Sequence, residues 1–173
     1  IDLSALKPAW PERLYSHEKK INLVPDMYVD ALAAISDTPM AMQDGEMLMI
    51  GRRHVRSNNS WMHNSHRLVK GKGRCDVMLH PQDAQRLEVA SGGLLRVSSE
   101  AGAIELPAHI SDDIMPGVIS VPHGWGHHRD GTQLQIAQQH AGRSINDVIS
   151  QTLEEPLTGM AILNGVRVQV AKV

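Results

Sequence analysis

The sequence has no phenylalanine, and aromatic residues make up only 3% of its 173 positions. A hydrophobic core must therefore be built from Val, Ile, Leu, Met and Ala. There is a single cysteine, Cys75, which excludes an internal disulfide and any metal or iron–sulfur site made from several cysteines of this chain. This cysteine usage suits a reducing compartment, so we expect a cytoplasmic protein, with a periplasmic parent left open.

The sequence also lacks any apolar run near the roughly 18 residues that a membrane span needs. We expect no signal peptide in it. The net charge of −2 gives no reason to expect nucleic acid or an anionic membrane as a partner. Because the sequence begins at Ile1 rather than methionine, we expect it to be a piece of a longer protein. Such a piece need not carry its own chemistry.

Positive charge is concentrated in one stretch. Residues 51–75 contain no acidic residue, and they hold seven of the 17 basic residues of the chain: Arg52, Arg53, Arg56, Arg67, Lys70, Lys72 and Arg74. The first 50 residues, in contrast, carry eight acidic and four basic residues. The charge pattern therefore separates the early part of the chain from a basic loop that follows it.

The first 45 residues are expected to form an arm that precedes a domain spanning residues 46–173. Prolines keep the start irregular. Lys20 to Val24 is a candidate short strand, and the dipeptide Pro25-Asp26 opens a predicted helix that Asp37-Thr38-Pro39 ends. Its apolar positions are Met27, Val29, Leu32, Ala33 and Ile35.

From residue 46 onward the pattern is mainly that of β-structure. Residues 103–110 alternate between apolar and polar side chains, which is the period of a half-buried strand. Further strands are predicted at 47–50, 76–79, 94–99, 118–121 and 166–170, and a short helix at 81–87. Many short strands separated by Gly and Pro turns favour a closed β-barrel. The long loops at 51–75 and 123–147 are then the natural places for function.

The basic loop is the strongest functional pattern that the residues show by themselves. It begins at Gly51, which allows close backbone approach, and continues with Arg52, Arg53 and His54. A guanidinium group matches phosphate oxygens with two parallel hydrogen bonds. The Ser and Asn side chains at 57–60 are suited to the edge of a heterocycle. The loop therefore indicates a pyrophosphate or nucleotide ligand, with a solvated basic surface as the alternative.

The ten histidines include His63, His66, His123, His127 and His128. A zinc site needs three or four ligands in a suitable spacing, and the glycines between His123 and His127 argue against a helix that would supply it. We therefore expect loop or ligand-facing histidines rather than a metal site.

A catalytic thiol would need a neighbouring base and a lowered pKa, so we expect Cys75 to be structural. Trp61 and Trp125 stand in the two long loops, where they could stack on a ligand ring or simply pack.

Several short motifs occur in an order that resembles a known domain. They are Ile50-Gly51-Arg52, Pro81-x-Asp83-Ala84-x-x-Leu87, Gly92-Gly93-Leu94-Leu95-Arg96-Val97-x-Ser99, Gly102-x-Ile104, Pro116-Gly117-Val118-x-x-x-Pro122, Gly124-Trp125-Gly126-His127, Ile145-Asn146-x-Val148 and Pro156-x-x-Gly159. The match covers residues 46–170 in consistent order. This arrangement resembles the C-terminal molybdopterin-dinucleotide-binding domain of the dimethyl-sulfoxide reductase, formate dehydrogenase and periplasmic nitrate reductase superfamily of molybdopterin oxidoreductases. It departs from that family at Gly93, where an acid is usual, and in lacking a late Lys near 160–164.

The resemblance implies a mainly β fold, a double-psi β-barrel of six main strands with short helices. It implies binding of molybdopterin guanine dinucleotide, two copies of which hold molybdenum in the whole enzyme. The metal ligand would come from other domains of the parent oxidoreductase, which are the expected protein partners, and the isolated chain would be inactive. The implied cofactor-binding residues are Gly51, Arg52, Arg53, His54, Ser57, Asn58, Asn59, Ser60, Trp125, Gly126, His127 and Asn146. No catalytic or metal-ligating residue is expected in the chain.

A second hypothesis belongs to a different class. A stand-alone double-psi barrel could serve as a binding or adaptor module, like the substrate-recognition domains of some ATPase chaperones. The basic loop and the Asn146 motif favour the cofactor-binding hypothesis, because an adaptor needs neither.

Overall fold

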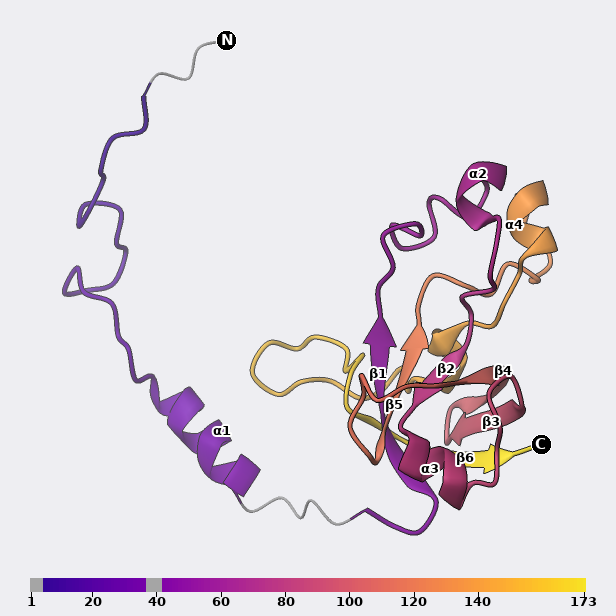
Figure 1. Cartoon of the computed structure of the whole chain (residues 1–173). Helices are drawn as coiled ribbons and strands as arrows, with labels where there is room; N and C mark the ends of the chain where they lie inside the picture. Colours follow the sequence, from indigo (N-terminus) through magenta and orange to yellow (C-terminus); the bar gives the residue numbers. More distant parts are fainter. Residues whose placement is uncertain (1–4, 37–41) are drawn as a thin grey trace. The chain divides into compact units, whose positions relative to one another are not determined.

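The computed structural model describes residues 5–36 and 42–173, and these two stretches belong to two separate units. The first unit contains helix α1 (Asp26–Ser36), and the second contains the strands labelled in Figure 1. The candidate functional residues all belong to the second unit.

Residues 42–173 form a closed barrel of six strands, whose bounds are β1 (Glu46–Arg52), β2 (Val77–Leu79), β3 (Leu94–Ser99), β4 (Gly102–Ile110), β5 (Val118–Pro122) and β6 (Val166–Lys172). Their order around the barrel is β1-β5-β2-β4-β3-β6. The pairs β1–β5 and β2–β4 are parallel and therefore need crossover connections, whereas the other neighbours are antiparallel. The expected fold class, a closed six-stranded barrel of the double-psi type, is confirmed.

Aliphatic side chains alternate along the strands and fill the interior of the barrel. In β4, Ile104, Leu106 and Ala108 point inward, which confirms the predicted period of two. The largest side chains that are fully buried include Met47, Met49, Leu79, Leu95 and Ile119. Burial of each such side chain contributes about 1.5–3 kcal/mol to the stability of the fold, as much as burial of a phenylalanine would. The barrel therefore has a full core without phenylalanine.

The predicted short helix is present as α3 (Pro81–Arg86), which the ring of His80 caps by accepting a hydrogen bond from the Gln82 N–H at 3.1 Å. Asp83 is buried and accepts a hydrogen bond from the Gly117 N–H at 2.7 Å, so it ties the helix to the turn before β5. Three further short helical segments lie in the two long loops: α2 (His66–Val69), α4 (Gln135–Gln139) and the 3-10 helix η1 (Ile145–Val148).

In the first unit the predicted helix is confirmed as α1, and apolar residues on it such as Met27, Val29 and Ile35 are exposed. The predicted strand at Lys20–Val24 is wrong, since no strand occurs in residues 5–36. Local side chains bind its backbone instead: the Lys20 N–H donates to Ser16 Oγ at 3.1 Å, and the Val24 N–H donates to Asn22 Oδ1 at 3.0 Å. Within the described residues, no helix is long and apolar enough to cross a membrane.

Candidate functional site

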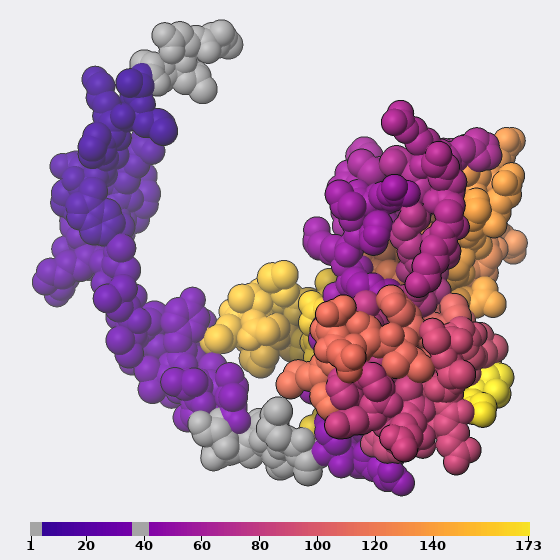
Figure 2. Space-filling model, viewed as in Figure 1, coloured from indigo at the N-terminus to yellow at the C-terminus, as the bar shows by residue number. Residues whose placement is uncertain are grey.

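The two long loops begin side by side because β1 and β5 are parallel neighbours. The last pair in the register joins Arg52 to Pro122, and the His123 N–H donates to the Arg52 carbonyl at 3.3 Å. Parallel strands end at the same edge, so the loop that follows β1 meets the loop that follows β5. Figures 1 and 2 show the resulting protrusion, in which the segment around α2 lies beside the segment around α4.

Close contacts fix the position of the loop after β1 against the loop after β5. A Cβ on Gly124 would clash with the Asn59 carbonyl oxygen, and the Gly124 φ of +88° is also one that favours glycine. The Asn59 Oδ1 lies 2.9 Å from Nε2 of His123. Further out, Asn64 Oδ1 accepts the N–H groups of Ile136 and Ala137 at the start of α4, at 3.0 and 3.2 Å. The two loops therefore behave as one structure rather than two independent surfaces.

A hollow of about 410 Å³ opens where these loops meet the end of β1, and we call it the main hollow. Its lining residues are Gly51, Arg53, Asn59, His123, Gly124, Ile145, Asn146, Ile149, Leu163 and Asn164. Four of them, Gly51, Arg53, Asn59 and Asn146, were predicted from the sequence. The lining contains a guanidinium group and three amides but no carboxylate, which suits an anionic ligand with hydrogen-bonding edges.

An adjoining hollow of about 390 Å³ shares Arg53 and Asn59 with the main hollow and adds the predicted residues His54 and Asn58. Burial lowers the pKa of His54, and the charges of nearby Arg74, Arg56 and Arg52 lower it further. His54 is therefore held toward its neutral form beside the arginines. Its Nδ1 accepts a hydrogen bond from the Arg56 N–H at 3.1 Å.

The two adjacent arginines have different environments. The Arg52 guanidinium forms an ion pair with Asp76 and also donates to the carbonyls of Ser120 and Asp76, at 3.4 and 3.2 Å. Arg53 is exposed, and it has no ion pair or hydrogen bond to any of the described residues. The donors of Arg53 are therefore available to a ligand, while Arg52 ties the end of β1 to β5 and to Asp76, the residue before β2.

Most of the remaining predicted residues lie around Trp125. A third hollow of about 310 Å³ is lined by Trp125, Ser57, His54 and Arg52 together with Asp76 and others. His127 lies next to Trp125, with 6.5 Å between ring centroids, and Gly126 donates its N–H to the Ala141 carbonyl at 2.8 Å. Neither Gly126 nor His127 nor Ser60 lines any of these three hollows. The structure thus distributes the predicted residues over two adjacent regions.

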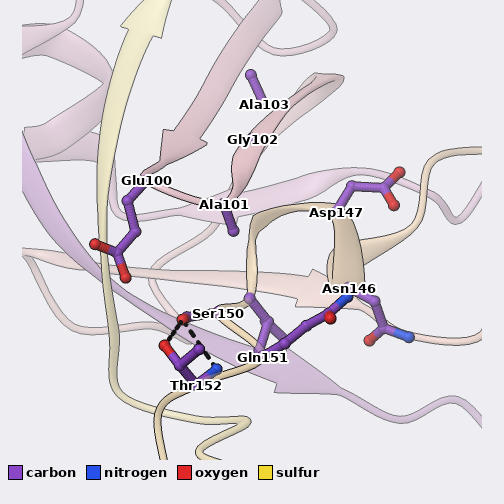
Figure 3. A pocket seen from close by; sticks show the side chains of 10 residues that line it. Glu100, Ala101, Gly102, Ala103, Asn146, Asp147, Ser150, Gln151 and Thr152 are labelled. Carbon is purple, nitrogen blue, oxygen red and sulfur yellow. Dashed lines mark hydrogen bonds between the residues drawn. The ribbon is translucent and has the colours of Figure 1, made fainter.

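A larger, open hollow of about 790 Å³ shares Asn146 and Ile149 with the main hollow and lies along the β3–β4 turn and the segment after η1. Figure 3 shows Glu100 and the hydrogen-bonded pair Ser150–Thr152 on one side of it and Asn146 and Asp147 on the other. Two carboxylates line it, those of Glu100 and Asp147, and carboxylates repel phosphates. A nearby cation, Arg129, is engaged by Asp147. The main hollow is therefore the better candidate for an anionic ligand despite its smaller volume.

The sequence did not single out His123 or Asn164 as site residues. Asn164 Oδ1 accepts the Gly51 N–H at 2.7 Å, which leaves the amide NH₂ available at the hollow. The one available signal was the Asn164-Gly165 dipeptide, which is typical of a turn before a strand. His123 could have been inferred from its place two residues after the end of the predicted strand at 118–121.

Cys75 has no nucleophilic setting. Burial raises the pKa of its thiol, and the sulfur accepts the Arg143 N–H at 3.4 Å. A Cβ on Gly142 would lie 2.7 Å from its sulfur atom. In the part of the chain that the structure describes, no group of three or more His, Cys, Asp or Glu side chains is arranged to hold a metal ion.

Residues 47–167 match the family described as "Molydopterin dinucleotide binding domain", and the chain therefore belongs to that family. It is a cofactor-binding domain of the type that molybdenum oxidoreductases contain. The resemblance that the motifs suggested is confirmed.

Among curated proteins, the chain is 26% identical over 114 residues to a tetrathionate reductase of Salmonella typhimurium, an alignment that covers 56% of this chain and 11% of that protein. It is 32% identical over 84 residues to biotin sulfoxide reductase of Cereibacter sphaeroides, an alignment that covers 47% of this chain and 11% of that protein. It is 25% identical over 171 residues to the probable oxidoreductase YoaE of Bacillus subtilis, an alignment that covers 96% of this chain and 23% of that protein. The chain thus spans only about a tenth to a quarter of the length of these relatives.

Among solved structures, acetylene hydratase from Pelobacter acetylenicus superposes with a TM-score of 0.63 at 20% identity, over 86% of this chain and 20% of that one. This likeness supports the fold of the chain and does not bear on its substrate.

Proposed function

We propose that this chain is the domain of a larger molybdenum oxidoreductase that binds molybdopterin guanine dinucleotide, and that the main hollow receives the cofactor. The observation that carries the proposal is the lining of that hollow, which combines the Arg53 guanidinium with three amides and contains no carboxylate. A pyrophosphate needs cationic donors, and a guanine or pterin edge needs paired donors and acceptors. The residues present therefore fit the cofactor.

Each residue of the main hollow has a role that follows from its chemistry. Arg53 binds phosphate oxygens, since none of the described residues occupies its donors. Gly51, which has no side chain, leaves room for the ligand beside the backbone. Asn59 and Asn146 hydrogen-bond the heterocyclic edges. When bound, the cofactor supplies the metal-centred redox chemistry, and this chain supplies its position and its electrostatic surroundings.

The predicted residues around Trp125 border the same region. Trp125 offers a ring face and His127 a ring nitrogen, and both belong to the loop that contacts Asn59. We propose that these two side chains, with Gly126, contact the pterin part of the cofactor. His54, Ser57, Asn58 and Ser60 shape the basic loop around it, and Arg52 acts on the cofactor through the loop it anchors.

Residues 1–45 serve as an arm that packs on other domains of the parent enzyme, which accounts for the exposed apolar side chains of α1. Among the described residues no group of side chains is arranged to hold a metal ion, and we propose that the isolated chain has no activity by itself. The single cysteine fits a cytoplasmic location.

The test is the cofactor content of the full-length protein, measured across a series of salt concentrations. Arg53→Ala should weaken cofactor binding by about 1–3 kcal/mol, the range for a hydrogen bond to a charged group, and the loss should shrink at high salt. Asn146→Ala should weaken binding with little salt dependence, because its contact is neutral. Arg67→Ala is the matched control, since Arg67 is an exposed arginine of the same loop that lines none of the hollows.

Equal cofactor loading in wild type, Arg53→Ala and Asn146→Ala would show that the main hollow is not the binding site. The adaptor hypothesis would then be the better account of the barrel. Turnover by the purified 173-residue chain with an artificial electron donor would refute the proposal that it is inactive alone.

A further inference from the structure

His63 is a buried polar residue that no role described above requires. Its side chain is only 1% exposed, although it stands in a loop of mostly polar residues between β1 and α2. Its Nδ1 lies 2.8 Å from Nε2 of His127, and its ring stacks at 4.0 Å on the ring of Trp125. The other ring nitrogen, Nε2, is buried without a hydrogen-bond partner among the described residues.

An apolar side chain of similar size would fill this space at a lower cost. A buried nitrogen without a partner costs about 1–3 kcal/mol, and Leu or Phe would avoid that loss. What an apolar residue cannot provide is the hydrogen bond to His127. The contact that distinguishes His63 from a packing residue is therefore the one that it makes to the Trp125–His127 segment.

The hydrogen bond couples the tautomers of the two rings. In a neutral pair, one imidazole must donate and the other must accept. If His63 Nδ1 donates, His127 accepts at Nε2 and carries its proton on Nδ1. If His63 accepts, His127 keeps its proton on Nε2 and presents a lone pair at Nδ1. His127 Nδ1 has no hydrogen-bond partner within the described residues, so its polarity toward a ligand depends on His63.

The surroundings keep both rings neutral. Burial lowers the pKa of His63 to about 4, the nearby His127 and His123 lower it as well, and a backbone group of Gly124 partly opposes the shift. Burial also lowers the pKa of His127, with a further lowering from His128. At neutral pH the pair therefore consists of two uncharged imidazoles, one of which donates the shared hydrogen bond while the other accepts it.

We propose that His63 is a positioning residue for the cofactor-binding surface: it fixes the ring orientation and the tautomer of His127, and it supports the face of Trp125. The inference rests on the proposed function, because it matters for the parent enzyme only if the Trp125–His127 segment contacts the cofactor. His63 itself touches no ligand and acts through these two side chains.

The first test follows the imidazole nitrogens of the purified chain by NMR, with the His127 signals assigned from a His127→Gln variant. Wild type should show one dominant tautomer of His127 and a pKa below the ordinary value of about 6.5. His63→Leu should produce averaged nitrogen shifts, while burial and His128 still hold the pKa of His127 below the ordinary value. His63→Asn, whose amide can replace the hydrogen bond, should restore a dominant tautomer. His66→Leu removes an exposed histidine of the same segment and should change nothing.

The second test measures the cofactor content of the full-length protein. His63→Leu should lower cofactor affinity by about fivefold, the loss expected for one oriented hydrogen bond, and His63→Asn should recover part of it. An unchanged His127 tautomer in His63→Leu would overturn the positioning role. A changed tautomer with full cofactor loading would overturn its link to the ligand, while the Arg53 and Asn146 variants decide the proposed function separately.

Discussion

Replacing Arg52 should destabilise the barrel, whereas replacing its neighbour Arg53 should not. The Arg52 and Asp76 side chains are 22% and 13% exposed, so the ion pair is largely shielded from water. Arg52→Ala would remove the pair together with the hydrogen bonds to two carbonyls, and it would leave the Asp76 carboxylate without its main partner. Breaking a buried pair from one side costs about 3–5 kcal/mol. Since part of the guanidinium still meets solvent, we expect a loss of about 2–4 kcal/mol in the free energy of unfolding.

The assay is urea unfolding of the purified chain at pH 7, followed by far-UV circular dichroism. Arg53→Ala is the matched control, because an exposed side chain without a partner among the described residues should change stability by less than about 0.5 kcal/mol. In an Asp76→Ala background, Arg52→Ala should cost much less than it does alone, since the two residues are coupled. If Arg52→Ala costs under about 1 kcal/mol, or if both arginine variants lose the same stability, the structural role given to Arg52 is refuted.

Three further outcomes are expected. In the unfolded chain His63 takes up a proton near pH 6.5, but in the folded chain only near pH 4. The free energy of unfolding should therefore fall by about 3 kcal/mol as the pH drops between these values. Urea unfolding across this pH range should show that His63→Leu abolishes that part of the loss. Gly124→Ala should disrupt the loop contact with Asn59 and lower the melting temperature. Gly131→Ala, whose new Cβ would have no neighbour within 4 Å, should lower stability only through the backbone strain of its positive φ of +83°. Cys75 should react with a thiol reagent more slowly than a free cysteine at pH 8 when followed by mass spectrometry, and rapid labelling of the folded chain would contradict the protected thiol.

The strands could be predicted because their information is local. In residues 103–110 the alternation of apolar and polar side chains is itself the inward and outward direction of the strand. The predicted strand at Lys20–Val24 failed for the complementary reason. A strand needs a neighbour to pair with, and the sequence of five residues does not say whether one exists.

The candidate site was predictable in part. The motifs led to the residues of the main hollow, because Gly51, Arg53 and Asn146 belong to segments with recognisable order. The different environments of Arg52 and Arg53 were not predictable, since they depend on Asp76, which the segment before β2 brings beside Arg52. His63 was missed as a positioning residue because a lone histidine in a polar loop has no period that would reveal its burial.

The position of β6 between β3 and β1 has a consequence for how the chain reaches its folded state. Because β6 is the last strand, the barrel stays open during synthesis until residues 166–172 are available. Until then, β1 and β3 each present an edge of unpaired backbone groups on which another chain can add a strand. Strand pairs between distant parts of the chain also form slowly, since the entropy of closing a long loop is lost before the new contacts stabilise the structure. Protection against aggregation therefore depends on the arrival of the seven residues of β6.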